Sequence, residues 1–165
     1  MSDFTHIDKK GQVRMMDVTD KEPSLRKALA QAVVHMHPDT FDRIVTHNVK
    51  KGNVLETARI AGIMAAKQTS SLIPMCHPLN ITHVQVDFFP DNQVHKIRIE
   101  AQVQIIDQTG VEMEALTAAC LTALTIYDMC KSLDKNIHIS DVCLLKKSGG
   151  KSGDFVRRTP PDVTS

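Results

Sequence analysis

The residues best suited to chemistry in this chain are lysines that stand beside carboxylates or glycines. Lys131 follows Asp128 by three positions, and Lys51 precedes Gly52 at the start of a predicted helix. A lysine beside a carboxylate at the rim of a pocket can transfer protons, but at a solvated surface the same spacing gives only a weak ion pair. Lys51 can likewise hold an anion at the helix start or lie in a solvated turn. These residues alone leave both alternatives open.

A second concentration of charge is the segment Lys146–Gly153, which holds three lysines, three glycines and two serines. Gly150-Lys151-Ser152 is similar to the phosphate loop of nucleoside triphosphatases, but Leu145 stands where that motif needs a glycine. We therefore disfavour a kinase or a triphosphatase. Amides and ammonium groups in such a loop, Lys147 among them, can still bind phosphate. The alternative is a flexible entry into the C-terminal tail.

Two further segments carry groups that could bind or orient a substrate. Between Pro74 and Pro78 lie Met75, Cys76 and His77, and the two prolines stiffen the backbone around them. This histidine could orient a substrate or move a proton, or it could be an ordinary loop residue. In the other segment, Glu112 and Glu114 flank Met113, and an extended backbone there would put both carboxylates on one face.

Composition limits the classes of function. The chain has 165 residues, 42% of them hydrophobic, with a formal net charge of +1 and no tryptophan. A near-neutral charge and only six aromatic residues argue against nucleic-acid binding, and no segment is apolar enough for a membrane span. The four cysteines show no CxxC spacing, which predicts reduced, buried thiols, no metal site and a cytoplasmic location.

The elements that must position these residues can be predicted from periodicity. Spacing predicts a helix from about Ser24 that passes into a strand at residues 33 to 36, then helices over 38 to 47 and from Asn53 onward. Alternation predicts a hairpin over residues 84 to 105, then a helix from about Val111 to Cys130 and a strand over 137 to 145. The order from residue 31 is βαββαβ. We therefore predict an α+β, ferredoxin-like fold, with an antiparallel sheet packed against helices. Residues 1–155 should form one domain and residues 156–165 a flexible tail.

Two long stretches are more specific than any of these patterns: KKGNVLETARIAGIMAAKQTSSLIPMCHPL at 50 to 79, and TGVEMEALTAACLTALTIYDMCKSLDKNIHISDVCLLKKSGGKSGD at 109 to 154. Together with Met16-Asp17-Val18 and Arg26, they closely resemble the MoaC family, the cyclic pyranopterin monophosphate synthases of molybdenum cofactor biosynthesis. The resemblance covers essentially residues 4 to 155.

The resemblance implies a phosphorus-oxygen lyase that rearranges 3′,8-cyclo-7,8-dihydroguanosine 5′-triphosphate to the cyclic pterin and releases pyrophosphate. It also implies a catalytic domain of ferredoxin-like fold, a homohexamer built as a trimer of dimers and sites between subunits. No metal or other cofactor is expected, and Mg²⁺ accompanying the triphosphate is left open. The small residues of the helix that begins at Asn53 fit burial against a neighbouring subunit.

The resemblance also assigns roles to individual positions. Lys51 and Lys131 would transfer protons, and Asp128 would set the charge and position of Lys131. The remaining positions would bind the substrate: Met75, Cys76, His77, Met113 and Glu114 as its lining, Glu112 in support, and Lys147 with Arg26 at the triphosphate. A rival interpretation is a non-catalytic anion-binding or assembly subunit with the same fold, and a metal-dependent hydrolase would need a ligand cluster that the sequence lacks.

Overall fold

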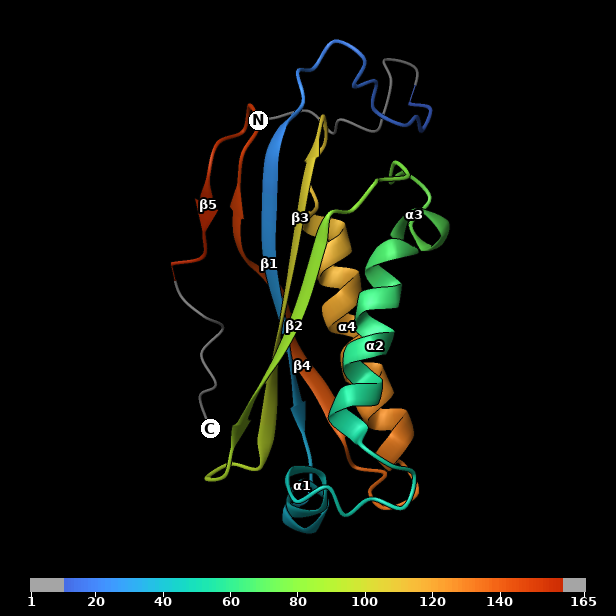
Figure 1. Ribbon diagram of the computed structural model, residues 1–165, viewed down its shortest axis with the longest axis vertical. Helices are drawn as coiled ribbons and strands as arrows, with labels where there is room; N and C mark the ends of the chain where they lie inside the picture. The colour runs from blue at the N-terminus through green and yellow to red at the C-terminus, as the bar shows by residue number, and fades with distance from the viewer. Residues whose placement is uncertain (1–10, 159–165) are drawn as a thin grey trace.

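The computed structural model describes residues 11–158 as one antiparallel sheet with its two long helices on one face (Figure 1). In chain order the elements are β1 (Ser24–His35), α1 (Pro38–Val45), α2 (Val54–Lys67), α3 (Thr69–Leu72), β2 (His83–Asp91), β3 (Lys96–Asp107), α4 (Glu112–Cys130), β4 (His138–Ser148) and β5 (Phe155–Val156). The strand order in space is β2-β3-β1-β4-β5, and every pairing is antiparallel. The first four strands have the order expected of a ferredoxin-like fold, which confirms the predicted class.

The first strand corrects the sequence-based prediction of a helix from Ser24. Ala28, Ala30, Ala32 and Val34 alternate along β1 and are all buried on the helix side of the sheet. Because β1 is bonded to β3 on one edge and to β4 on the other, tertiary pairing overrides the helical preference of its alanines. This makes β1 the central strand on which the helices pack.

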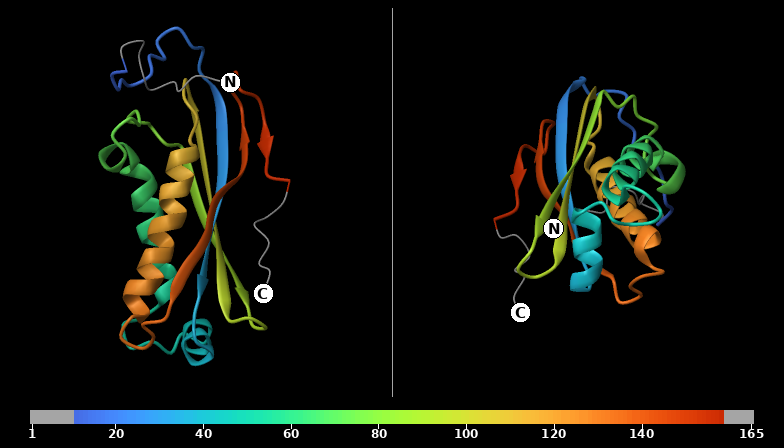
Figure 2. Two further views of the ribbon diagram at one scale, coloured as in Figure 1. Left: turned by 180° about the vertical axis from the view of Figure 1, so that it is seen from behind. Right: turned by 60° about the horizontal axis from the view of Figure 1, so that its bottom comes forward.

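The helices α2 and α4 run side by side along the sheet, as both views from opposite sides show (Figure 2). Asn53 caps α2 as predicted, because its side chain accepts a hydrogen bond from the Glu56 amide at 3.1 Å. A Cβ atom on Gly62 would clash with the Thr122 hydroxyl of α4, so glycine permits this close approach. The small residues of α2 thus pack within the same chain, and the expectation that they face another subunit is wrong.

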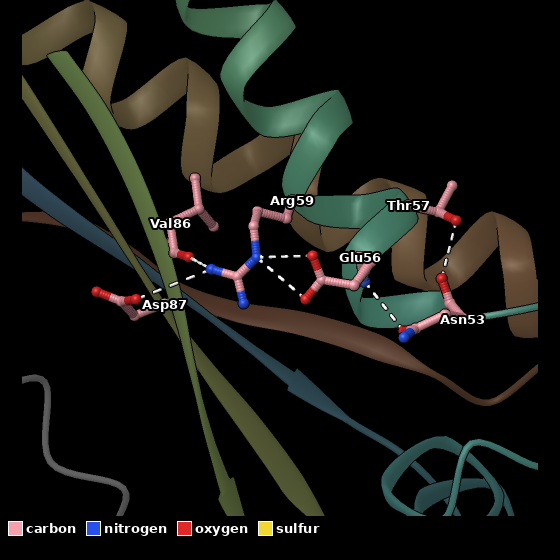
Figure 3. Close-up of polar contacts among 6 residues, drawn as sticks. All are labelled: Asn53, Glu56, Thr57, Arg59, Val86 and Asp87. Carbon is pink, nitrogen blue, oxygen red and sulfur yellow. Dashed lines mark hydrogen bonds and ion pairs between the residues drawn. The ribbon is translucent and has the colours of Figure 1, made fainter.

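One side chain ties α2 to the outer strand β2. Arg59 donates to the carbonyl oxygen of Val86, forms an ion pair with Asp87 at 3.8 Å, and is also paired with Glu56 on its own helix (Figure 3). Its guanidinium lies over the Phe88 ring as well. Since β2 is at the edge of the sheet with β3 as its one neighbour, Arg59 joins α2 to this outer strand.

The C-terminal part of the described chain contains a short strand that was not predicted. Phe155 and Val156 form β5, paired with Lys147 and Lys146, and the Arg157 amide donates to Leu145 at 2.8 Å. Residues 156 and 157 of the predicted tail thus have main-chain partners on β4, and its last residues, 159–165, lie outside the described part. Among residues 11–158, no helix combines the length and apolar character needed to cross a lipid bilayer.

Candidate functional site

A cavity of about 1030 Å³ opens at the end of the molecule where α4 begins. Its walls come from the segment before β1, the loop after α3, the first turn of α4 and the loop after β4. Eight residues singled out from the sequence line it: Arg26, Met75, Cys76, His77, Glu112, Met113, Glu114 and Lys147. The fold thus gathers residues that are more than a hundred positions apart in the chain.

The first turn of α4 supplies two carboxylates to this cavity. Residues 112 to 114 are helical, so the extended backbone considered for them is wrong, and Glu112 and Glu114 point in different directions. Glu114 is buried, with 3% of its surface exposed. Burial, reinforced by the nearby charge of Glu112, raises its pKa to about 7. A carboxyl group with this pKa can donate or accept a proton near neutral pH.

Lys147 is a cation of the cavity wall with defined side-chain partners. Its ammonium group lies 2.9 Å from a carboxylate oxygen of Glu112 and 3.0 Å from the Ser152 hydroxyl. These contacts hold the amine between α4 and the glycine-rich loop Ser148–Gly153, in which Gly149 and Gly150 have φ of +90° and +86°. A ligand phosphate could displace Ser152 and bind between the ammonium group and the loop amides.

The Arg26 side chain is less available to a ligand than the sequence suggested. Its guanidinium donates to the carbonyl oxygens of Asp107 and Gln108, both at 3.2 Å, and so fixes the end of β3. A Cβ atom on Gly150 would overlap the same guanidinium. Arg26 therefore packs against the glycine-rich loop. Only some of its N–H groups remain available to a ligand.

His77 connects the loop after α3 to the segment that precedes β1. Its Nε2 lies 3.0 Å from the Met16 carbonyl oxygen and must donate, because a carbonyl can only accept. The segment from residue 11 to Glu22 arches over this end of the molecule, shown in blue in Figure 1. Beside His77, burial raises the pKa of the Cys76 thiol, and the nearby Glu114 adds to that shift. This cysteine is a neutral thiol at physiological pH, unsuited to act as a nucleophile.

The three residues assigned to proton transfer form a separate cluster at the other end of α4. The Lys51 ammonium group donates to the main-chain oxygen of Asp128 at 3.0 Å, while the Asp128 carboxylate holds Lys131 at 2.6 Å. Their hydrogen bond raises the pKa of Lys131 and lowers the pKa of Asp128, so both stay charged. Both side chains are largely exposed to solvent.

The helix α4 separates the two groups of predicted residues. From Glu112 to Asp128 the axial rise is about 24 Å at 1.5 Å per residue. That distance is too great for one small substrate to touch both ends of α4 in a single chain. The structure therefore brings the substrate-binding set together but places Lys51, Asp128 and Lys131 elsewhere.

The chain is similar to known proteins over nearly its whole length. The family model described as "MoaC family" matches residues 15–150. This chain belongs to the MoaC family. It is 62% identical over 156 residues to the cyclic pyranopterin monophosphate synthase of Desulforapulum autotrophicum, covering 94% of this chain and 96% of that one. It is 60% identical to the protein of the same name from Desulfatibacillum aliphaticivorans, with 94% and 98% covered, and 54% identical to that of Roseiflexus sp., with 94% and 99% covered.

In this MoaC-family chain the cavity also holds charged residues that sequence reasoning missed. Lys21 and Lys27 line it, as do Asp20 and Glu22. Most of them lie in a polar segment before β1 that has no periodicity, so nothing in the sequence indicated that it covers a cavity. A metal centre is not apparent, since no three His, Cys, Asp or Glu side chains of residues 11–158 converge as ligands.

The four cysteines are free thiols, but their environments differ from the prediction. Only Cys130 is buried, whereas Cys76, Cys120 and Cys143 are partly exposed. Burial raises the pKa of the Cys130 thiol to about 11, which makes it inert. It packs in the core beneath the turn that follows α4.

Proposed function

We propose that the protein is a cyclic pyranopterin monophosphate synthase. It converts (8S)-3′,8-cyclo-7,8-dihydroguanosine 5′-triphosphate to cyclic pyranopterin monophosphate and releases pyrophosphate, in molybdenum cofactor biosynthesis. Support comes from family membership and from relatives of that name aligned over nearly the whole chain. The reaction rearranges a ring and expels pyrophosphate without redox change, so it requires acids, bases and cations.

The observation that carries the proposal is the composition of the cavity. It combines a lysine-bearing glycine loop, suited to phosphate, with a buried carboxyl group of pKa about 7. Lys147, with the free part of Arg26, would bind the triphosphate. Met75, Cys76, His77, Met113 and Glu114 would surround the ring system, and Glu112 would hold Lys147.

The second part of the proposal is that each site is shared between two subunits. Lys51, Asp128 and Lys131 lie about 24 Å from the cavity along α4, so a second copy must bring them to the substrate. Sharing of this kind is consistent with a homohexamer built as a trimer of dimers. Apolar side chains left exposed on α2 and α4, Ile60, Met64 and Leu124, offer surfaces that such contacts could bury.

In the shared site Lys51 and Lys131 would transfer protons, and Asp128 would position both. Asp128 binds the two lysines through different atoms, its main-chain oxygen and its carboxylate. We assign no metal or other cofactor to these steps, and Mg²⁺ would only accompany the triphosphate. We place the enzyme in the cytoplasm, where its cysteines would stay reduced.

The rival hypothesis is a subunit that binds the triphosphate without turning it over. Incubation of the pure protein with the cyclic dihydroguanosine triphosphate separates the two. We expect a pterin product and stoichiometric pyrophosphate, measured by chromatography and a coupled phosphate assay. Binding without either product would contradict the proposed function and favour the rival.

A further inference from the structure

The glycine-rich loop that follows Lys147 contains three glycines in the left-handed region. Gly149, Gly150 and Gly153 have φ of +90°, +86° and +69°, and the Gly153 amide donates to Gly150 at 3.1 Å. A free chain with this composition has many accessible conformations, and ordering it costs more entropy than ordering other residues. Something outside the loop must therefore select the conformation in which Lys147 and Ser152 meet.

The side chains of Asp154 and Arg157, which follow the loop, form hydrogen bonds where the loop begins and with the strand before it. The Asp154 carboxylate accepts a hydrogen bond from the Gly149 amide at 3.3 Å. Arg157 Nε donates to the Leu144 carbonyl oxygen at 2.9 Å. These contacts join β4 to β5, a two-residue strand that pairs Phe155 with Lys147 and is too short to be stable by itself.

Neither Asp154 nor Arg157 lines the cavity. Both are exposed on the outer side of the sheet edge, where a substrate in the cavity would not contact them. Their hydrogen bonds to main-chain groups of the hairpin instead set the path of the chain between Ser148 and Gly153. Any effect of Asp154 or Arg157 on ligand binding must therefore come from the conformation of the loop.

We propose that Asp154 and Arg157 are positioning residues that hold the glycine-rich loop in the conformation that binds a polyphosphate. The proposal rests on the proposed function, because it takes the loop with Lys147 as the triphosphate site. Asp154 acts as a hydrogen-bond acceptor and Arg157 as a donor, and neither needs to touch the ligand. Their loss should weaken binding of the triphosphate more than it slows the chemical step.

Arg157 has a matched control next to it. Arg158 carries the same charge, and its side chain forms no hydrogen bond or ion pair with the rest of the described chain. Arg157→Met and Arg158→Met thus remove equal charge from the same exposed segment. We expect Arg157→Met to raise KM by about 2- to 10-fold, the range for one hydrogen bond, with kcat nearly unchanged. Arg158→Met should match the wild type.

Asp154 allows a second control at one position. Asp154→Asn keeps an oxygen acceptor for the Gly149 amide but removes the charge, whereas Asp154→Ala removes both. We expect Asp154→Ala to raise KM by about the same 2- to 10-fold, and Asp154→Asn to restore most of the loss. If the asparagine variant is as weak as the alanine variant, the charge itself matters and the positioning role is wrong.

Calorimetric titration with inorganic triphosphate distinguishes failure of this inference from failure of the proposed function. If wild type binds inorganic triphosphate, and Arg157→Met and Asp154→Ala bind it more weakly than their controls, the positioning role is supported even without turnover. Equal affinity for Arg157→Met and Arg158→Met, with both variants folded by circular dichroism, overturns it. Absence of triphosphate binding by wild type also overturns it.

Discussion

The two ends of α4 present opposite environments to their charged residues. At the N-terminal end, Glu114 is buried against a cavity and its pKa rises to about 7. At the C-terminal end, Lys131 and Asp128 form an exposed ion pair that stabilises both charges. The N-terminal end has an environment that changes acid–base behaviour, while the C-terminal end has the catalytic residue types without such an environment.

This contrast is the physical basis for the proposal that one chain makes half of a site. An exposed ion pair is screened by water and contributes little to stability or to proton transfer. If a second chain covers Lys51, Asp128 and Lys131 with its cavity, water is excluded and the same charges interact more strongly. In the exposed pair Lys131 is an ammonium group, so in the proposed reaction it would start as a proton donor.

The largest expected effect comes from removing a proton-transferring lysine. Lys51→Ala or Lys131→Ala should lower kcat by at least ~10²-fold, the scale for losing a general acid or base, while substrate still binds. Stopped assays at saturating substrate give kcat, and calorimetry gives binding. Lys50→Ala is the control, because Lys50 is an exposed neighbour of Lys51. Near-native turnover in both Lys51→Ala and Lys131→Ala would show that this end of α4 carries only surface charge.

A smaller loss is expected for Asp128→Asn, which keeps the shape of the side chain but removes its charge. The Asp128 main-chain oxygen still binds Lys51, so only Lys131 loses its partner. We expect kcat to fall by about 10-fold. Because the hydrogen bond that Lys131 donates to the Asp128 carboxylate raises the pKa of Lys131, its loss should also move the alkaline limb of the pH–kcat profile to lower pH. An unchanged alkaline limb would contradict the assignment of Lys131.

At the cavity end, Lys147→Ala should affect binding more than chemistry. We expect KM to rise by about 10-fold, as for loss of a charged hydrogen bond, with a smaller change in kcat. In the wild type, substrate affinity should weaken with salt, and this dependence should be shallower in the variant. Lys146→Ala is the control, since Lys146 is exposed and does not line the cavity. A fall in kcat at constant KM would instead place Lys147 in the chemical step.

The smallest effect is a stability difference at Glu114. Folding raises its pKa from 4.5 to about 7, so the ionised form is disfavoured and stability is lost as pH rises through that interval. Glu114→Gln removes the penalty. It should match the wild type in urea unfolding near pH 4.5 and exceed it by on the order of 1 kcal/mol above pH 7. A constant difference across this range would mean that Glu114 titrates normally.

The sequence predicted the elements that have clear periodicity. The helix with its cap at Asn53 and the hairpin of β2 and β3 follow local rules, and the structure confirms them. Pro90, predicted to break the chain between these strands, instead lies within β2 opposite Ile97. The first strand was predicted as a helix from the spacing of its residues, although Ala28, Ala30 and Ala32 also alternate with period two. Only the pairing of β1 with both neighbours decides between the two patterns.

The candidate site likewise has features that the sequence predicts and features that it does not. The glycine-rich loop and the rigid segment around His77 could be identified from residue types, and eight assigned residues do line one cavity. The predicted helix from Val111 to Cys130 already implies that Lys131 lies at the far end of α4 from Glu112, but the sequence could not show that Arg26 is partly occupied by main-chain carbonyls. The Arg26 contacts depend on distances between elements, which spacing along the chain does not contain.

The central claim is that the two ends of α4 from different subunits form one site, and mixing inactive variants tests it directly. Subunits of Lys131→Ala are dissociated and reassembled with subunits of Lys147→Ala, and turnover is measured at a substrate concentration where each variant alone is nearly inactive. Two variants of the same end, Lys51→Ala and Lys131→Ala, are mixed as the control. In a dimer of one Lys131→Ala subunit and one Lys147→Ala subunit, one shared site contains both substitutions and the other contains neither. Random reassembly should therefore restore about a quarter of wild-type activity, whereas the control pair should restore none. Absence of restoration in reassembled mixed dimers, or equal restoration in both mixtures, would contradict a site shared between subunits.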